Sequence, residues 1–405
     1  MIVKDKKIRV CMLSYSFYES DNRVRRYAET LAKDKADVDV ISLRRGDHSK
    51  KENINGVNVY RIQKRIRNEI SKFSYLTKMI TFFILSMLFI SYRHIKNRYD
   101  LIHVHNIPDF LVFVALIPKL TGSKIILDIH DLLPEFYMNK FNTDENSFFT
   151  KMLLLVEKLS GSFADQVIVS NHIWQNRYAA RSVKLEKTIV ILNFPDDNFF
   201  NLPAPNKFQD KFIMIYPGTL NWHQGLDIAI RAFNIIKDEV PGVEFHIYGE
   251  GSSKCDLIRL TEQLGLTKRI LFMDPLPIDQ VAVMMKRADF GVVPKRADSF
   301  GNEAFSTKIL EFMALGIPVI VSKTKIDTFY FNDSVVLFFE NGDFHDLAKK
   351  MLLMVNDKNL RLKYISNSHR FVNDYKWAKK KRIYLNLVNS FTEVHRNMLN
   401  ADYRK

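Results

Sequence analysis

The chain has 405 residues, of which 47% are hydrophobic and 26% charged. This length suits two α/β domains of ordinary size, and the composition excludes disordered and collagen-like classes. Sixty Lys and Arg against 45 Asp and Glu leave a net charge of +15, which favours an anionic partner such as a phosphorylated metabolite, acidic lipid or nucleic acid. The two cysteines, Cys11 and Cys255, lie far apart in the sequence and do not have the spacing of a disulfide framework or a metal site. We therefore expect the protein to lie in a reducing cytoplasm.

Short β-branched runs alternate with longer amphipathic stretches before residue 195. The runs are IRVCML, VDVISL, VNVYRI, LIHVHN, IILDIH, QVIVSN and TIVILN. This alternation predicts a parallel sheet covered by helices on both faces.

The segment SYSFYESDNRVRRYAETLAK follows the first predicted strand and has the pattern of a capped helix. Asp21 or Asn22 can cap this helix, and Arg23 is then expected to contact an anion. Arg25 and Arg26 are expected to be solvated.

No metal site is predicted. The run DVD at Asp37–Asp39 has an Asp-x-Asp spacing that binds Mg²⁺ in other sugar transferases. It opens a strand in the first half of the chain, however, and we interpret it as a solvated edge.

The most apolar run, MITFFILSMLFISY at residues 79–92, is flanked by the basic stretches RIQKRIR and RHIKNR. Spanning a bilayer needs about 20 apolar residues, so this run of fourteen is expected to be too short. It is either a buried helix of the first domain or an interfacial helix whose basic flanks contact anionic lipid. The two interpretations are compatible if one face of the helix is exposed.

His103 and His105 alternate on one predicted strand and therefore point to the same face. We interpret His103 as structural and His105 with Asn106 as the rim of a ligand cleft.

The segment NFPDDNFFNLPAPNKFQD, residues 193–210, contains three prolines and is predicted to link two domains. Strands then restart, and from about Leu347 the sequence is helical. The later strands are FIMIYPG, VEFHIYG, ILFMD, FGVVP, PVIVS and VVLFF. We predict domains at 1–200 and 201–370, with C-terminal helices at 371–405 that pack back toward the first domain. Two facing α/β domains would form a deep cleft at the carboxyl ends of their strands.

The stretch EAFSTKILEFMALGIPVIVS predicts a helix from about Thr307 to Leu315, followed by a buried strand. Ser306 or Thr307 serves as its N-cap, and Gly316 suits the C′ position. The free amides and positive dipole end at its start suit a phosphate.

Glu303 lies in the loop before this helix, and Glu311 lies one turn into it. A carboxylate can accept hydrogen bonds from a pair of sugar hydroxyls, so the spacing fits a nucleotide sugar. The alternative is that both are ordinary solvated charges, with Glu311 paired to Lys308.

This stretch resembles the Glu-x7-Glu motif of the retaining group 1 (family 4) glycosyltransferases, and the resemblance extends over nearly the whole chain. IYGEGSSKCDL is similar to the family's glycine loop, and ILFMDPLPIDQVAVMMKRADFGVVP to its base-binding turn. LIHVHNIPDFLVFVALIPKLTGSKIILDIHDLLPE resembles its histidine segments, and WAKKKRIYLNL its crossover helix. The resemblance implies the GT-B fold: two Rossmann-like, doubly wound parallel-sheet domains facing across a cleft, with a C-terminal crossover helix.

The resemblance also implies the roles of particular residues. It assigns catalysis to His130 and Glu303. Lys308, at the start of the helix, is expected to lie beside the donor diphosphate and to take part in catalysis. The residues implied to bind the donor are Glu311, Gly218, Thr219, Gln224, Gly249, Gly251, Pro275, Phe305, Ser306 and Thr307. The residues expected to contact the acceptor or an anion are Arg23, Asn22, His105 and Asp131.

One departure from the family pattern concerns the diphosphate. Thr219 and Gln224 stand where the family usually has an Arg and a Lys. Hydrogen bonds to charged groups contribute roughly 1.5–3 kcal/mol each, so another cation is expected to replace them. Lys308 is the first candidate. The alternatives are Lys295, Arg296 and His223.

The implied function is metal-independent transfer of a sugar, with retention, from a nucleoside-diphosphate sugar, most commonly UDP-linked in this family. The acceptor is a hydroxyl of a glycan or lipid-linked molecule in cell-envelope polysaccharide synthesis. No cofactor beyond the donor and no nucleic acid is expected. We expect cytoplasmic location and contact of residues 61–98 with anionic membrane at its inner face. The alternatives are a sugar phosphorylase, a nucleotide-sugar epimerase and a catalytically weak scaffold.

Overall fold

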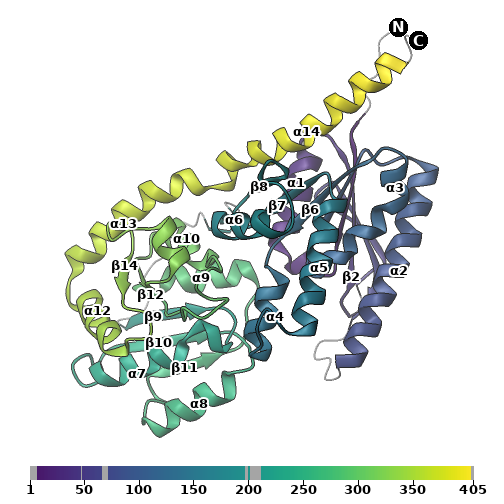
Figure 1. Cartoon of the computed structure of the whole chain (residues 1–405). Helices are drawn as coiled ribbons and strands as arrows, with labels where there is room; N and C mark the ends of the chain where they lie inside the picture. Colours follow the sequence, from purple (N-terminus) through teal and green to yellow (C-terminus); the bar gives the residue numbers. More distant parts are fainter. Residues whose placement is uncertain (1–6, 47, 66–71, 197–198, 201–210, 403–405) are drawn as a thin grey trace. The chain divides into compact units, whose positions relative to one another are not determined.

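The structure is a computed structural model that describes residues 7–46, 48–65, 72–196, 199–200 and 211–402, with side chains not placed at 72–75 and 392–402. Most of the predicted linker and part of the basic flank before residue 72 lie outside these residues. The chain forms two compact units, one of residues 1–193 with 381–405 and the other of residues 194–380. Each unit is described by itself (Figure 1).

Unit 1 contains an eight-stranded sheet with the order β3-β4-β2-β1-β5-β6-β7-β8, parallel except for the β3–β4 pair. The strands are β1 (Arg9–Ser14), β2 (Asp37–Arg44), β3 (Lys51–Ile54), β4 (Val57–Lys64), β5 (Leu101–His105), β6 (Lys124–Ile129), β7 (Gln166–Val169) and β8 (Thr188–Val190). The order reverses between β1 and β5. In such a sheet the crevice at this switch point is where ligands bind.

Helices connect the strands of unit 1. They are η1 (Tyr18–Ser20), α1 (Asn22–Lys33), α2 (Lys72–Lys96), η2 (Asp109–Ala115), α3 (Leu116–Leu120), α4 (Leu133–Phe141), α5 (Phe148–Phe163), α6 (His172–Arg181) and η3 (Leu185–Lys187). Asp21 caps α1, because its Oδ1 accepts a hydrogen bond from the Val24 amide at 3.1 Å.

Strand β3 was not predicted from the sequence, because its residues KENI are polar and largely exposed. The turn that joins it to β4 is Asn55-Gly56, and both residues have positive φ, 52° and 86°. An Asn-Gly pair is the strongest short hairpin signal, since a two-residue type I′ turn needs positive φ at both positions. That dipeptide was the available clue.

Unit 2 contains a six-stranded parallel sheet with the order β11-β10-β9-β12-β13-β14. Its strands are β9 (Phe212–Pro217), β10 (Val243–Tyr248), β11 (Ile270–Met273), β12 (Phe290–Val293), β13 (Val319–Ser322) and β14 (Leu337–Phe339). Its helices are η4 (Trp222–Gln224), α7 (Leu226–Ile236), α8 (Lys254–Gln263), α9 (Ile278–Arg287), α10 (Thr307–Ala314), α11 (Lys325–Tyr330), α12 (Phe344–Asn356), α13 (Lys358–Val372) and η5 (Asn373–Tyr375); α14 (Trp377–Asp402) begins here and continues in unit 1.

The sheet of unit 2 is buried on both faces. Along β9, Met214 and Tyr216 join the core under α7, α8 and α12, whereas Ile213 and Ile215 join the core under α9 and α10. This alternation follows from the period-2 geometry of a strand. The predicted fold class, two α/β domains built on parallel sheets, is confirmed.

Helix α2 corrects the prediction that its apolar run is too short to span a membrane. The run lies inside a helix of 25 residues. By length and composition, its segment Leu76–Lys96 is long and apolar enough to cross a membrane. One side of α2, which carries Met79, Phe82 and Ile90, is buried against the rest of unit 1. The helix therefore covers the sheet with this side.

Asp39 in β2 was expected to be solvated, and that expectation is wrong. Its side chain is fully buried, and Oδ2 accepts hydrogen bonds from Arg9 Nη2 at 3.0 Å, Arg93 Nη2 at 2.8 Å and the Tyr99 hydroxyl at 2.6 Å. The carboxylate is buried because two guanidinium groups from β1 and α2 compensate its charge. Arg26 was also expected to be solvated, but it is buried and donates to Asn193 Oδ1 at 2.8 Å.

Candidate active site

The predicted donor-binding residues of unit 2 gather at the carboxyl ends of β9, β10, β11 and β12. The loop after β9 and the loop after β12 flank the point where the strand order reverses. A backbone hydrogen bond joins them, from the Arg296 amide to the His223 carbonyl at 2.9 Å. This is the place at which open α/β sheets bind phosphate-containing ligands.

The N-terminus of α10 is open to an anion. Ser306 is the N-cap residue, as predicted, but its hydroxyl caps no amide and, although buried, has no hydrogen-bond partner among the described residues. The backbone amides of residues 305–308 likewise have no acceptor in the described part of the chain. Free amides at a helix start, with a hydroxyl beside them, suit a phosphate group.

Lys308 extends from this helix end toward the tip of β9. Its Nζ lies 5.3 Å from the centre of the Tyr216 ring, and its Cε is 2.7 Å from where a Cβ on Gly218 would stand. Within the described residues the ammonium makes no hydrogen bond and no ion pair, so the alternative of a surface pair with Glu311 is not formed. Burial lowers the pKa of Lys308, and nearby Lys295 lowers it further while Glu311 raises it. An anion beside Lys308 would compensate this charge.

The alternative cations are occupied by other contacts. Lys295 is 2% exposed, and its Nζ lies 3.0 Å from Asp327 Oδ2 and 2.7 Å from the Ala304 carbonyl. Arg296 pairs with Asp227 at 2.6 Å and lies over the Trp222 ring. Burial lowers the pKa of His223, which favours its neutral form. Of Lys295, Arg296 and Lys308, only Lys308 has a charged group with no ion pair or hydrogen bond among the described residues.

The two glutamates of the motif differ in their surroundings. Glu303 is 5% exposed, and its Oε1 pairs with Lys325 Nζ of α11 at 2.8 Å. The loop that carries it is held by Lys295 through Ala304 and by an Ile326 amide bond to the Asn302 carbonyl at 3.0 Å. Glu311 is partly buried on α10, one turn after Thr307. The pairing of Glu303 with Lys325 was not predicted.

The glycines of the loop after β10 have a specific packing role. A Cβ on Gly249 would lie 1.8 Å from the Gly218 carbonyl oxygen, and a Cβ on Gly251 would lie 2.4 Å from the Leu220 backbone. Gly249 also has φ of +150°. Glycine is needed here because the two loops pack backbone to backbone. From the sequence, a different reason was expected for glycine at these two positions, namely the close approach of a nucleotide to the backbone.

Thr219 and Gln224, which stand where the family usually has cations, form contacts with Tyr216 near the end of β9. The Tyr216 hydroxyl lies 2.9 Å from both Gln224 Oε1 and the Thr219 carbonyl oxygen. Thr219 is exposed. Pro275 is exposed in the loop between β11 and α9, and Phe305 packs its ring against Tyr330 and Phe331.

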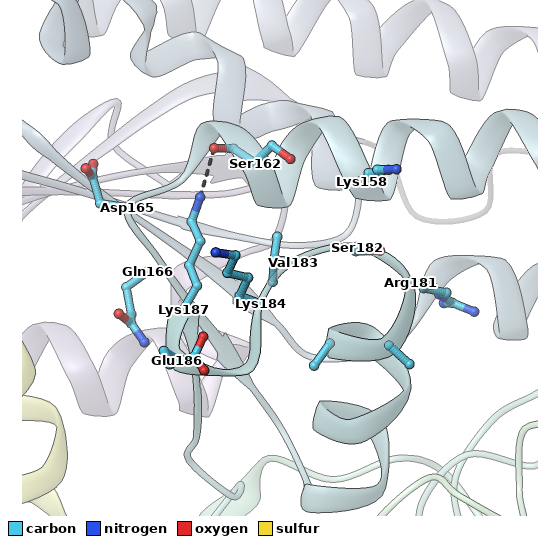
Figure 2. Close-up of a pocket in the computed structure, with 12 residues that line it drawn as sticks. Lys158, Ser162, Asp165, Gln166, Arg181, Ser182, Val183, Lys184, Glu186 and Lys187 are labelled. Carbon is cyan, nitrogen blue, oxygen red and sulfur yellow. Dashed lines mark hydrogen bonds between the residues drawn. The ribbon is translucent and has the colours of Figure 1, made fainter.

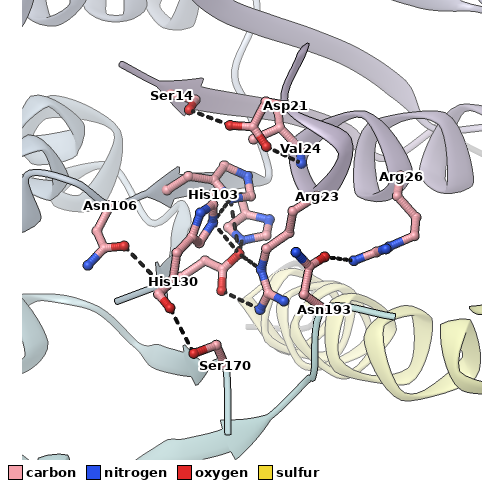
Figure 3. Close-up of polar contacts among 12 residues, drawn as sticks. Ser14, Asp21, Arg23, Val24, Arg26, His103, Asn106, His130, Ser170 and Asn193 are labelled. Atoms are coloured by element: carbon pink, nitrogen blue, oxygen red, sulfur yellow. Dashed lines mark hydrogen bonds and ion pairs between the residues drawn. The ribbon is translucent and has the colours of Figure 1, made fainter. Parts of the chain in front are cut away.

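In unit 1, a buried carboxylate at the end of β6 organises the predicted acceptor residues (Figure 3). Arg23 Nε and Nη2 donate to Asp128 Oδ2 and Oδ1, both at 2.8 Å, and Arg23 is 3% exposed. Burial alone raises the pKa of Asp128, but the guanidinium of Arg23 holds it well below its usual range. Arg23 therefore contacts an anionic group of the protein itself, through Nε and Nη2. Its Nη1 is buried without a hydrogen-bond partner among the described residues, and contact with a bound anion stays a prediction.

His105 is fully buried, so its expected place on a cleft rim is also wrong. Its Nδ1 lies 3.0 Å from Asp128 Oδ2. His103 is structural, as predicted: it is fully buried, and its Nδ1 lies 2.9 Å from the Tyr384 hydroxyl of α14. Ligand atoms of His103, His105 and Asp128 lie within 4.8 Å of one another. Because both Asp128 oxygens already accept from Arg23, these residues form a hydrogen-bond network in which a cation would have to compete with the guanidinium.

His130 follows β6 and its side chain is 24% exposed. Its Nε2 lies 3.1 Å from Asp128 Oδ2, and its backbone amide donates to Asn106 Oδ1 at 2.7 Å. Asp131 is partly buried beside it, and burial raises the pKa of that carboxyl. Asn22, the first residue of α1, is partly buried. Sequence reasoning missed Asp128, although the run LDIH places it two residues before His130.

A polar hollow of about 740 Å³ lies elsewhere in unit 1, between the ends of α5 and α6 (Figure 2). Gln166, the first residue of β7, lines it, whereas the histidines lie at the opposite ends of the strands. Lys187 crosses the hollow and donates to the Ser162 carbonyl at 2.8 Å. None of the predicted site residues lines it.

A family model described as "Glycosyl transferases group 1" matches residues 197–371, and a model described as "Glycosyl transferase 4-like domain" matches residues 20–193. The chain belongs to the group 1 glycosyltransferases. Its two parallel-sheet units are those of the GT-B fold, as the resemblance implied.

Relatives of this glycosyltransferase include the gpi3 subunit of phosphatidylinositol N-acetylglucosaminyltransferase from Schizosaccharomyces pombe, 27% identical over 56% of this chain and 47% of the relative. The O-antigen biosynthesis glycosyltransferase WclY of Escherichia coli is 25% identical over 74% of this chain and 82% of the relative. Among solved structures, Anabaena HepE in complex with UDP and glucose has a TM-score of 0.71 at 18% identity, covering 94% of this chain and 99% of HepE. At 18% identity, this structural similarity is evidence for the fold and for nothing beyond it.

Proposed function

We propose that this glycosyltransferase moves a sugar from a UDP-linked donor to a hydroxyl of a glycan or lipid-linked acceptor, with retention of the anomeric configuration and without a metal ion. The observation that carries the proposal is the N-terminus of α10, where free amides, the Ser306 hydroxyl and the Lys308 ammonium converge. The UDP complex of HepE and the O-antigen role of WclY support the donor and the class of product.

In the proposed reaction, the bond between the anomeric carbon and the donor phosphate breaks while the glycosidic bond forms on the same face. The departing phosphate takes the proton of the acceptor hydroxyl. Lys308 and the α10 amides stabilise the negative charge that develops on the leaving diphosphate. Glu303 and His130 orient the reacting groups. No side-chain base is needed in this scheme.

Donor binding can be tested with the nucleotide alone. We expect UDP to raise the thermal stability of the protein more than GDP or ADP does, in the absence of metal, because a ligand that binds the native state stabilises it. Glu311→Ala should weaken UDP binding by about 10-fold to 100-fold, since it removes a charge-assisted hydrogen bond. Isothermal titration measures this directly.

Glu262→Ala is the matched control, because Glu262 is an exposed helix glutamate of the same unit. A sugar phosphorylase or an epimerase would give phosphate-dependent cleavage or an isomerised sugar in place of UDP and a glycoside. Failure of every nucleotide to bind would favour the scaffold alternative. The anomeric configuration of the product, read by NMR, decides between retention and inversion.

We also propose that unit 1 contacts anionic membrane at the inner face of the plasma membrane. The side of α2 that faces away from the sheet is apolar: Leu76, Ile80, Ile84 and Leu88 are each at least 46% exposed. Their spacing of four residues places them in one row along the helix. An exposed apolar row of this size marks an interaction surface.

Two nearby elements of unit 1, α3 and α5, also carry exposed apolar side chains. Helix α3 packs against α2, and α2 and α5 both pack against η2. The exposed apolar residues of these neighbours are Leu116, Ile117, Leu120, Phe148, Phe149, Met152, Leu155 and Leu159. Lys151 and Lys158 are exposed on α5 among them. Aromatic and aliphatic side chains beside lysines are typical of a surface that binds the interface of an anionic bilayer.

The double substitution Ile84→Glu/Leu88→Glu should reduce binding to vesicles containing anionic lipid by at least about tenfold, because burial of one aliphatic side chain contributes roughly 1.5–3 kcal/mol. Sedimentation with vesicles measures the bound fraction. Leu362→Glu, at an exposed leucine of α13 in unit 2, is the control. Unchanged binding of the double variant would show that this surface is not the contact.

A further inference from the structure

The contacts around His130 bear on which of its two ring nitrogens carries a hydrogen. Asp128 Oδ2 is approached by three nitrogen atoms: Arg23 Nε at 2.8 Å, His105 Nδ1 at 3.0 Å and His130 Nε2 at 3.1 Å. Arg23 is held against Asp128 through both carboxylate oxygens (Figure 3). This buried ion pair was not part of the sequence prediction for the site.

The chemistry of an ionised carboxylate restricts where the imidazole hydrogens can stand. A carboxylate only accepts hydrogen bonds, so an imidazole nitrogen that is hydrogen-bonded to Asp128 carries the hydrogen. His105 Nδ1 and His130 Nε2 also lie 3.2 Å from each other. In the arrangement in which both nitrogens donate to Asp128, this contact is not a hydrogen bond. In the alternative arrangement, His105 Nδ1 donates to His130 Nε2, and the hydrogen of neutral His130 stands on Nδ1. A neutral imidazole has one N–H, so neutral His130 with a protonated Nε2 keeps a lone pair on Nδ1.

The remaining nitrogen is the one available to a ligand. His130 Nδ1 has no hydrogen-bond partner among the described residues, and the side chain is partly exposed. The backbone of His130 is fixed on both sides, because Asn106 Oδ1 accepts from its amide at 2.7 Å and its carbonyl accepts from Ser170 Oγ at 2.8 Å. A fixed backbone and a fixed Nε2 leave the ring little freedom to turn.

We propose that Asp128, held in place by Arg23, is a positioning residue that keeps His130 in the Nε2–H tautomer, so that Nδ1 accepts a hydrogen bond from a hydroxyl of the sugar acceptor. This inference rests on the proposed function for the identity of the hydroxyl. It concerns the tautomer and orientation of His130, and Asp128 itself need not touch the substrate.

The tautomer can be observed without any turnover. In protein labelled with ¹⁵N-histidine, two-bond ¹H–¹⁵N spectra distinguish the two neutral tautomers, and His130→Gln identifies the His130 signals by their loss. We expect the Nε2–H pattern in the wild type and a mixture in Arg23→Met/Asp128→Leu. That double substitution removes both charges, which avoids leaving one buried and unpaired.

Tyr384→Phe is the control for the spectra. It removes the hydroxyl beside His103. Among the described residues this hydroxyl is hydrogen-bonded to His103 and not to Asp128 or His130, so the His130 tautomer should not change. If the double variant does not fold, Asp128→Asn replaces it, with the same expected loss of a single tautomer. An Nδ1–H tautomer in the wild type, or an unchanged His130 pattern in the folded variant, would overturn the proposal.

A mutant cycle provides the functional test. We expect Arg23→Met/Asp128→Leu to lower kcat for transfer by about tenfold, the size of one lost hydrogen bond, with the KM for the donor unchanged. In the His130→Gln background the same substitutions should change kcat by less than about twofold, because residues that act through one another are not additive. Additive losses would mean a purely structural role. Absence of transfer in the wild type would refute the proposed function, and the tautomer measurement would still decide this inference.

Discussion

Lys308→Met is expected to lower kcat for sugar transfer by about 10²-fold to 10³-fold, the usual effect of removing one group that stabilises charge in a transition state. Lys308 has no hydrogen bond or ion pair among the described residues, and it stands beside Gly218 at the free start of α10. Methionine preserves most of the side-chain volume and removes the charge. The measurement is steady-state transfer with the donor and a hydroxyl acceptor.

The same substitution should not destabilise unit 2. Burial lowers the pKa of Lys308, which means that the protonated side chain is disfavoured in the folded state when no anion is bound. We therefore expect an unchanged or higher free energy of unfolding together with the loss of activity. Lys323→Met is the control, because Lys323 is an exposed lysine of the same unit that pairs with Glu340. Activity of Lys308→Met within threefold of the wild type would mean that another group supplies the charge.

The second large effect concerns the stability of the loop that carries Glu303. Lys295→Met should lower the free energy of unfolding of unit 2 by about 3–5 kcal/mol, because it leaves the Asp327 carboxylate buried without its cation. The two side chains are 3% and 0% exposed, and their charged atoms lie 3.0 Å apart. Lys295 also donates to the Ala304 carbonyl at 2.7 Å, so the loop should loosen as well.

Hydrogen exchange measured by mass spectrometry suits this prediction, because it reports on peptides of unit 2 separately from those of unit 1. Lys295→Met/Asp327→Asn should recover part of the loss, since it removes both charges. Breaking the exposed Lys323–Glu340 pair should cost less than about 1 kcal/mol. Equal losses for the buried and exposed pairs would contradict the argument from burial.

The strands and the helix of the Glu-x7-Glu motif were predictable because their signals are local. Buried parallel strands need runs of β-branched residues, and every run identified in the sequence is a strand in the structure. Ser306, Thr307 and Gly316 mark the ends of α10 as expected, with Gly316 at φ of +67°. The glutamates, the histidines and the missing cations could be read from residue order alone.

Partners that lie far apart in the sequence were not predictable in this way. Arg23 and Asp128 are 105 residues apart, and nothing local shows that the guanidinium meets a buried carboxylate at the end of β6. Arg23 was therefore expected to meet an external anion, and Asp128 was not identified. The same reason applies to Asp39, whose buried position depends on arginines from two other elements.

The sequence by itself determined the fold class and the family, and it named Lys308 as a candidate for the cation expected in place of the usual Arg and Lys. These follow from hydrophobic period, capping residues and motif spacing, which are properties of neighbouring residues. Only the tertiary structure decided which charges are compensated. It paired Arg23 with Asp128, Lys295 with Asp327 and Arg296 with Asp227, while Lys308 has no such partner among the described residues. The free energy of a buried charge depends on the groups that folding brings within a few ångströms of it, and that information is distributed over the whole chain.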